Sequence, residues 1–74
     1  MLTIREVIAL SRKRAGLTQA ELAEQLTAIK REMLGPDTRP VTGIHISRWE
    51  HGVSPSDLSR AVLSRWLEKS QLDE

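Results

Sequence analysis

The sequence contains no cysteine, phenylalanine or tyrosine, and two tryptophans are its only large aromatic residues. The lack of cysteine excludes disulfides, thiolate zinc sites and cysteine nucleophiles, and it is typical of proteins that work in a reducing compartment. No apolar run approaches the roughly 18 residues that span a membrane, and no signal-peptide pattern opens the chain. We therefore expect a cytoplasmic protein that makes no use of a membrane.

Length and charge set further bounds. The chain has 74 residues, so we expect one domain, 1–74, with a small core. The formal net charge is only +1, but Lys and Arg outnumber Asp and Glu by eight to five up to Arg48, whereas the ratio is three to five from Trp49 onward. This basic excess is compatible with a nucleic-acid partner, although an ordinary solvated surface gives the same distribution.

Helix-start and helix-stop signals divide the chain, and no stretch alternates apolar and polar residues at the period of a strand. The segments "TIRE" at 3–6 and "TQAE" at 18–21 are capping boxes, in which the Thr and Glu side chains each bond the other's backbone N–H. Thr42 is the natural cap of a third helix, and Ser54 with Pro55 at the first helical position starts a fourth. The sequence therefore predicts an all-α fold with helices at about 4–15, 19–34, 43–51 and 55–69.

Each predicted helix has apolar residues at helical spacing, which mark the face that it turns toward a shared core. Trp49 follows Ile46 by three residues, so both side chains should point inward from the third helix. Trp66 is expected in the core or at an interface between subunits. The other core candidates are Ile4, Val7 and Ile8 in the first helix, Leu22, Leu26, Ile29 and Met33 in the second, and Leu58 and Val62 in the fourth.

The segments "RKRAGLTQAELAEQL" at 12–26 and "VTGIHISRWEHG" at 41–52, followed by Pro55, resemble the lambda-repressor/Cro-like (Xre-type) helix-turn-helix family. The resemblance covers most of the chain and implies a compact domain of four helices, with a fifth helix missing or fused into the fourth. It also implies a transcriptional regulator that binds double-stranded DNA in a sequence-specific manner. We expect a repressor that binds an inverted repeat as a homodimer, because a dimer places two recognition helices about 34 Å apart.

Positions that match the family pattern imply which residues meet DNA. Gln19 would contact a base edge and support the neighbouring phosphate. Arg48 is the strongest candidate for base recognition, because arginine pairs with guanine through two hydrogen bonds. The resemblance also implies a structural ion pair between Arg12 and Glu50, whereas His45 could equally be a passive surface group. The further DNA-binding candidates on the second and third helices are Thr18, Thr42, Gly43, Ile44, His45 and Ser47.

Residues 27–40 depart from the family pattern, in which a turn of three or four residues follows the position of Leu26. If the second helix runs to residue 34, the segment after it is long enough to return to the third helix. We therefore expect a protruding arm, residues 27–40. Its cations, Lys30, Arg31 and Arg39, would lie beside the DNA backbone or against a partner subunit.

Two other functions stay open. The fold could be a protein-interaction module that has lost DNA binding and docks another protein through the arm. It could also be the DNA-binding antitoxin of a toxin pair, in which Ile29, Met33 and Leu34 of the arm, or the last helix, would contact the toxin. An enzyme is not expected, because no convergent carboxylate pair, Ser/His/Asp set or glycine-rich phosphate loop is suggested. No cofactor is implied, and the six-residue spacing of His45 and His51 does not suit a shared metal site.

Overall fold

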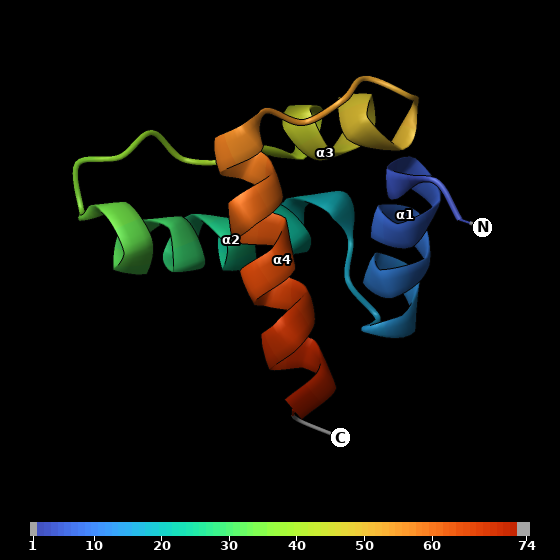
Figure 1. Cartoon of the computed structure of the whole chain (residues 1–74), viewed down its shortest axis with the longest axis horizontal. Helices are drawn as coiled ribbons and strands as arrows, with labels where there is room; N and C mark the ends of the chain where they lie inside the picture. Colours follow the sequence, from blue (N-terminus) through green and yellow to red (C-terminus); the bar gives the residue numbers. More distant parts are fainter. Residues whose placement is uncertain (1, 73–74) are drawn as a thin grey trace.

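The computed structural model describes residues 2–72, with side chains up to residue 70. The described residues form four α-helices and no strand, so the prediction of an all-α chain is confirmed. α2 packs against both α3 and α4, and α1 packs against α3 (Figure 1). The helices are α1 (Ile4–Arg14), α2 (Gln19–Leu34), α3 (Gly43–Glu50) and α4 (Asp57–Leu72).

Thr3 and Thr18 cap the first two helices. The Thr18 hydroxyl accepts the N–H of Glu21 at 3.1 Å, and the Thr18 N–H donates to the Glu21 carboxylate at 2.9 Å. Thr3 and Glu6 form the same box, with the Glu6 nitrogen 3.4 Å from the Thr3 hydroxyl. These reciprocal bonds satisfy amides that a helix start otherwise leaves without partners, so both helices begin at defined residues.

α4 begins later than the sequence indicated. The predicted start was Pro55 with Ser54 as its cap, whereas α4 starts two residues after Pro55. The Ser56 hydroxyl accepts the N–H of Ser59 at 3.2 Å, so Ser56 is the capping residue. Pro55 is buried in the connection from α3, which means that tertiary packing, and not the local sequence, decides between two chemically equivalent serine caps. At its other end α4 continues to Leu72, beyond the predicted limit near 69.

The core lies where α2 meets α3 and α4. Trp49 and Trp66 are both buried in it. Three core predictions are wrong, because Ile4, Met33 and Leu58 are each at least 40% exposed. Each of these three lies within two residues of a helix end, where the neighbouring helices no longer cover it. The buried apolar residues are Ile8, Leu22, Ala23, Leu26, Ile29, Ile46, Trp49, Val62, Leu63 and Trp66.

The second half of α2 and the loop after it project to one side of the molecule (Figure 1). Gly35 caps the end of α2, and its φ of 102° lies in a region that favours glycine because glycine has no Cβ. The loop then runs back along the helix toward α3. Lys30 Nζ donates to the carbonyl of Arg39 at 3.0 Å, so one cation of the arm holds the returning chain.

Thr27 closes the base of the arm. Its hydroxyl oxygen accepts the N–H of Val41 at 2.9 Å, and it lies 3.1 Å from the Val41 carbonyl and 2.7 Å from the Ala23 carbonyl. The single hydroxyl proton can donate to one of these two carbonyls at a time. The chain that follows α2 therefore re-enters the helical bundle at one point, directly before α3.

Candidate functional site

α3 has one anchored face and one free face. With eight residues it is too short to be stable alone, so burial against its neighbours holds it in place. Ile46 and Trp49 are only 0% and 6% exposed, and full burial of an isoleucine side chain stabilises a fold by about 1.5–3 kcal/mol. Ile44, by contrast, is 65% exposed, and His45 and Arg48 are also exposed. The free face therefore carries one apolar side chain, one imidazole and one guanidinium.

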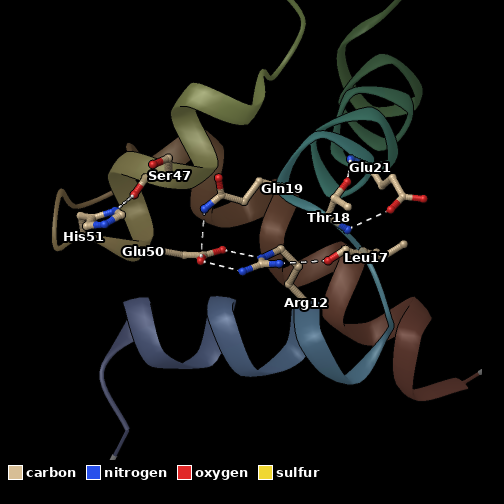
Figure 2. A network of polar contacts seen from close by, with 8 residues as sticks. All are labelled: Arg12, Leu17, Thr18, Gln19, Glu21, Ser47, Glu50 and His51. Carbon is tan, nitrogen blue, oxygen red and sulfur yellow. Dashed lines mark hydrogen bonds and ion pairs between the residues drawn. The ribbon is translucent and has the colours of Figure 1, made fainter.

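An ion pair between Arg12 of α1 and Glu50 of α3 fixes the other side of this helix (Figure 2). Arg12 Nε donates to Glu50 Oε2 at 2.7 Å, and Arg12 Nη2 donates to Glu50 Oε1 at 3.0 Å. Arg12 Nη1 also donates to the Leu17 carbonyl at 3.0 Å, which ties the connection between α1 and α2 to the pair. The two charged side chains are only 14% and 10% exposed. The structure thus forms the pair that the resemblance to lambda-repressor/Cro-like proteins had implied.

The ion pair keeps Glu50 ionised. The hydrogen bonds from Arg12 hold the pKa of Glu50 below its ordinary value of 4.5, although burial acts in the opposite direction. The hydrogen bond from Gln19 and the positive charges of Arg12 and Lys13 lower this pKa further. At neutral pH the carboxylate is therefore a charged group that can only accept hydrogen bonds.

Gln19, the first residue of α2, bonds to the same carboxylate. Its Nε2 donates to Glu50 Oε1 at 3.4 Å. Figure 2 shows the amide nitrogen turned toward Glu50 and the amide oxygen turned away from it. Because Glu50 belongs to α3 and accepts bonds from α1 and α2, three helices are joined at one side chain.

Thr42 and His45 form the start of α3. The Thr42 N–H donates to His45 Nδ1 at 3.1 Å, and the Thr42 hydroxyl lies 3.1 Å from the same nitrogen. Since Nδ1 accepts a backbone N–H, the neutral His45 ring carries its proton on Nε2. The first turns of α1 and α2 each contain an acidic residue, whereas that of α3 contains none. The positive end of the α3 dipole therefore has no neighbouring carboxylate in its own first turn.

The structure brings several predicted DNA-binding residues together. Gly43 lies against the first turn of α2, because a Cβ at this position would be 3.6 Å from the Ala20 nitrogen and 3.9 Å from the Gln19 carbonyl carbon. Arg31 of the arm borders the same groove as Thr42 and Gly43. The starts of α2 and α3 and one cation of the arm thus share one region of the surface.

Other predicted residues have more limited roles in the structure. Thr18 is exposed, but its hydroxyl and its N–H are both engaged in the capping box of α2. Ser47 is half-buried, and its carbonyl accepts a bond from His51 Nδ1 at 2.6 Å. Arg39 is exposed, whereas Lys30 is half-buried and its ammonium is engaged with the Arg39 carbonyl. Arg31 and Arg39 are therefore the more accessible cations of the arm.

Besides the bond of Gln19 to Glu50, two other contacts that position the site were missed by sequence reasoning. Thr27 is the buried polar residue that fixes Val41 before α3, and its only signal is a threonine between the apolar positions Leu26 and Ile29. The Trp66 indole N–H donates to the Gln25 side-chain oxygen at 2.8 Å, which links α4 to α2. Neither contact follows from local spacing, because its two partners lie far apart in the chain.

The groups that converge at Glu50 are N–H donors of Arg12 and Gln19. Within residues 2–72, no group of three or more His, Cys, Asp or Glu side chains could hold a metal ion. None of the helices in this range is both long and apolar enough to cross a membrane. Comparisons of the chain with protein-family models, with curated proteins and with solved structures found no match.

Proposed function

We propose that this protein is a sequence-specific regulator that binds double-stranded DNA through α2 and α3, as its resemblance to lambda-repressor/Cro-like helix-turn-helix proteins implies. The observation that carries the proposal is the two-sided construction of α3. Ile46 and Trp49 are buried, while Ile44, His45 and Arg48 are exposed on the rest of the helix. A helix that is anchored on one face and free on the other fits the major groove, which is about 12 Å wide.

The chemistry of the surrounding surface supports this assignment. Arg48 offers a planar set of N–H donors that matches guanine O6 and N7. The amides at the start of α3 point away from the helix and suit a phosphate oxygen. Arg31 borders the groove beside Thr42 and Gly43, so the arm would add a positive charge along the DNA backbone.

Two copies of the chain are needed for adequate specificity. A single short recognition helix contacts too few base pairs to give the affinity of a specific regulator. One molecule carries one such helix and is 34 Å long in its longest dimension. Paired half-sites lie about 34 Å apart between centres, so a second copy of the chain has to supply the second helix. We therefore propose a homodimer that represses transcription in the cytoplasm from an inverted-repeat operator.

Selection of bound duplexes from a randomised DNA library, at about physiological salt, tests the proposal. Enrichment of a two-fold symmetric sequence is the expected result, and the spacing of its half-sites would constrain the dimer. Failure of the folded protein to enrich any sequence would contradict it. Circular dichroism of the same sample establishes that the helices are formed.

Substitution Arg48→Ala tests base recognition directly. We expect binding to the selected site to weaken by about 1–3 kcal/mol, with relaxed preference at one base pair in each half-site. Arg65→Ala, an exposed arginine of α4, is the matched control and should bind as the wild type does. An equal loss on every DNA sequence would assign Arg48 to a phosphate instead of a base.

A second candidate function is protein interaction through the arm, either alone or in a DNA-binding antitoxin. Met33 and Leu34, near the end of α2, are 40% and 51% exposed, which favours this candidate. Ile29, which was expected to contribute to the same surface, is instead 5% exposed in the core. The double substitution Met33→Ser and Leu34→Ser separates the two functions. It should leave DNA selection unchanged but abolish binding to a protein partner that a neighbouring gene encodes.

A further inference from the structure

The side-chain amide of Gln19 has two chemically different ends, and Glu50 distinguishes between them. The amide nitrogen can donate, whereas the amide oxygen can only accept. The Glu50 carboxylate can also only accept, so turning the amide around would bring two acceptor oxygens together. The contact between Gln19 Nε2 and Glu50 Oε1 at 3.4 Å is therefore the orientation that the chemistry permits.

The position of the carboxylate is itself restricted. Arg12 holds both oxygens of Glu50, at 2.7 and 3.0 Å, and the Glu50 side chain is 10% exposed. The same hydrogen bonds keep the pKa of Glu50 below its ordinary value, so the acceptor stays charged at neutral pH. Among the described residues the Gln19 oxygen accepts no hydrogen bond, and Figure 2 shows it directed away from the ion pair.

We propose that Glu50 is a positioning residue for base recognition: it holds Gln19 by the amide nitrogen, so that the amide oxygen faces outward and accepts a hydrogen bond from an exocyclic amine of a base. This inference rests on the proposed function, because recognition of a base requires that the protein bind DNA. It identifies the kind of base that the start of α2 would select. Arg12 orients Glu50, Glu50 orients Gln19, and Gln19 meets the DNA.

The edges of the bases in the major groove differ in whether they can donate a hydrogen bond to this oxygen. Adenine N6 and cytosine N4 are amine donors, whereas guanine O6 and thymine O4 are acceptors at the corresponding edges. A Gln19 oxygen that is fixed outward therefore favours adenine or cytosine at one position of one strand and disfavours guanine or thymine there. A phosphate oxygen is also an acceptor, so it could be contacted only by the remaining N–H of the amide.

The first experiment uses the protein without DNA. In the nitrogen-15 spectrum of the side-chain amides, we expect one Nε2 proton of Gln19 to exchange slowly and to lose this protection in Glu50→Asp. Aspartate keeps the charge that faces Arg12 but withdraws the carboxylate by one methylene. Gln25 is the internal control, because it is engaged through its oxygen by Trp66 and its amide protons should not respond. Equal exchange of the Gln19 protons in the two proteins overturns the proposed role of Glu50.

The second experiment compares DNA selection by the wild type, Gln19→Ala and Glu50→Asp. We expect the wild type to prefer adenine or cytosine over guanine or thymine by about 3- to 10-fold at one position per half-site, and both variants to lose that preference while they keep the rest of the site. Gln19→Ala keeps the inference testable if Glu50→Asp does not fold. An enriched site that Gln19→Ala leaves unchanged overturns this inference alone, whereas no enrichment by the wild type overturns the proposed function as well.

Discussion

Glu50 has the largest structural role of any single residue in the site. It lies at the end of α3, forms an ion pair with α1 through Arg12, and accepts a weaker bond from α2 through Gln19. Because Arg12 is 14% exposed, removing the carboxylate would leave a mostly buried guanidinium with only one carbonyl as its partner. Loss of one member of such a pair costs more than the pair itself contributes.

Substitution Glu50→Gln should therefore change how stability depends on pH. The pKa of Glu50 is lowered in the folded state, so its stabilisation is present above the ordinary value of 4.5 and is lost as pH falls through the lower folded pKa. We expect the variant to lose about 2–4 kcal/mol of unfolding free energy near neutral pH and to show a shallower loss than the wild type on acidification. Urea denaturation at a series of pH values measures both effects.

The control for this experiment is Glu32→Gln. Glu32 pairs with Lys69 at 3.0 Å, but its side chain is 63% exposed, so the pair should contribute less than about 1 kcal/mol. Coincident stability curves for the wild type and Glu50→Gln from neutral to acidic pH would show that the Arg12 pair is not a source of stability.

Thr27 provides a second test at the level of one residue. Valine has the shape of threonine without the hydroxyl, so Thr27→Val would leave the Val41 N–H without its partner. We expect a loss of about 1–3 kcal/mol in unfolding free energy, because a half-buried donor would be left unsatisfied. Thr38→Val, in the loop of the arm, is the matched control and should have little effect. Equal stability of Thr27→Val and the wild type would mean that Val41 is held by packing alone.

At the scale of the elements, substitutions can test which serine caps the start of α4. Ser56→Ala should lower the free energy of unfolding by about 1 kcal/mol, because it removes the acceptor for the Ser59 N–H. Ser54→Ala removes the cap that local sequence favoured and should have little effect. Thermal denaturation of the two variants side by side gives the comparison, and the reverse order of stability would place the cap at Ser54.

The elements also show which features local sequence determines. The starts of α1 and α2 follow from capping boxes whose partners are three residues apart, and the end of α2 follows from Gly35. The start of α4 and the exposure of Leu58 depend on where other helices lie. The Ser54–Pro55 signal therefore predicted the wrong start, and helical spacing wrongly predicted a buried Leu58.

The contacts of the site likewise depend on tertiary packing more than on local sequence. Arg12 and Glu50 are 38 residues apart in the chain, and only the resemblance to a family paired them before the structure was known. The bond of Gln19 to Glu50 and the bond of Thr27 to Val41 depend on how the arm returns to α3, so no local pattern indicates them.

For the whole molecule, the net charge of +1 is small for a protein that is proposed to bind a polyanion. Attraction to DNA would then depend on where its cations lie, and Arg31 and Arg39 are exposed on the projecting arm. If both contact phosphates, the double substitution Arg31→Ala and Arg39→Ala should reduce the slope of log binding constant against log salt by about 2. Arg65→Ala on α4 should leave the slope unchanged. An unaltered slope in the double variant would assign the arm to contacts with protein.

The closure of the arm by Thr27 and Val41 has an evolutionary consequence. A segment that leaves a fold and returns to it at one point can be lengthened, shortened or exchanged while the helices on either side keep their places. Each doubling of such a loop costs only about 0.6 kcal/mol in closure entropy. The loop 35–40 is thus a natural graft point, where new sequence can be inserted between α2 and α3 without rebuilding the surface that they share.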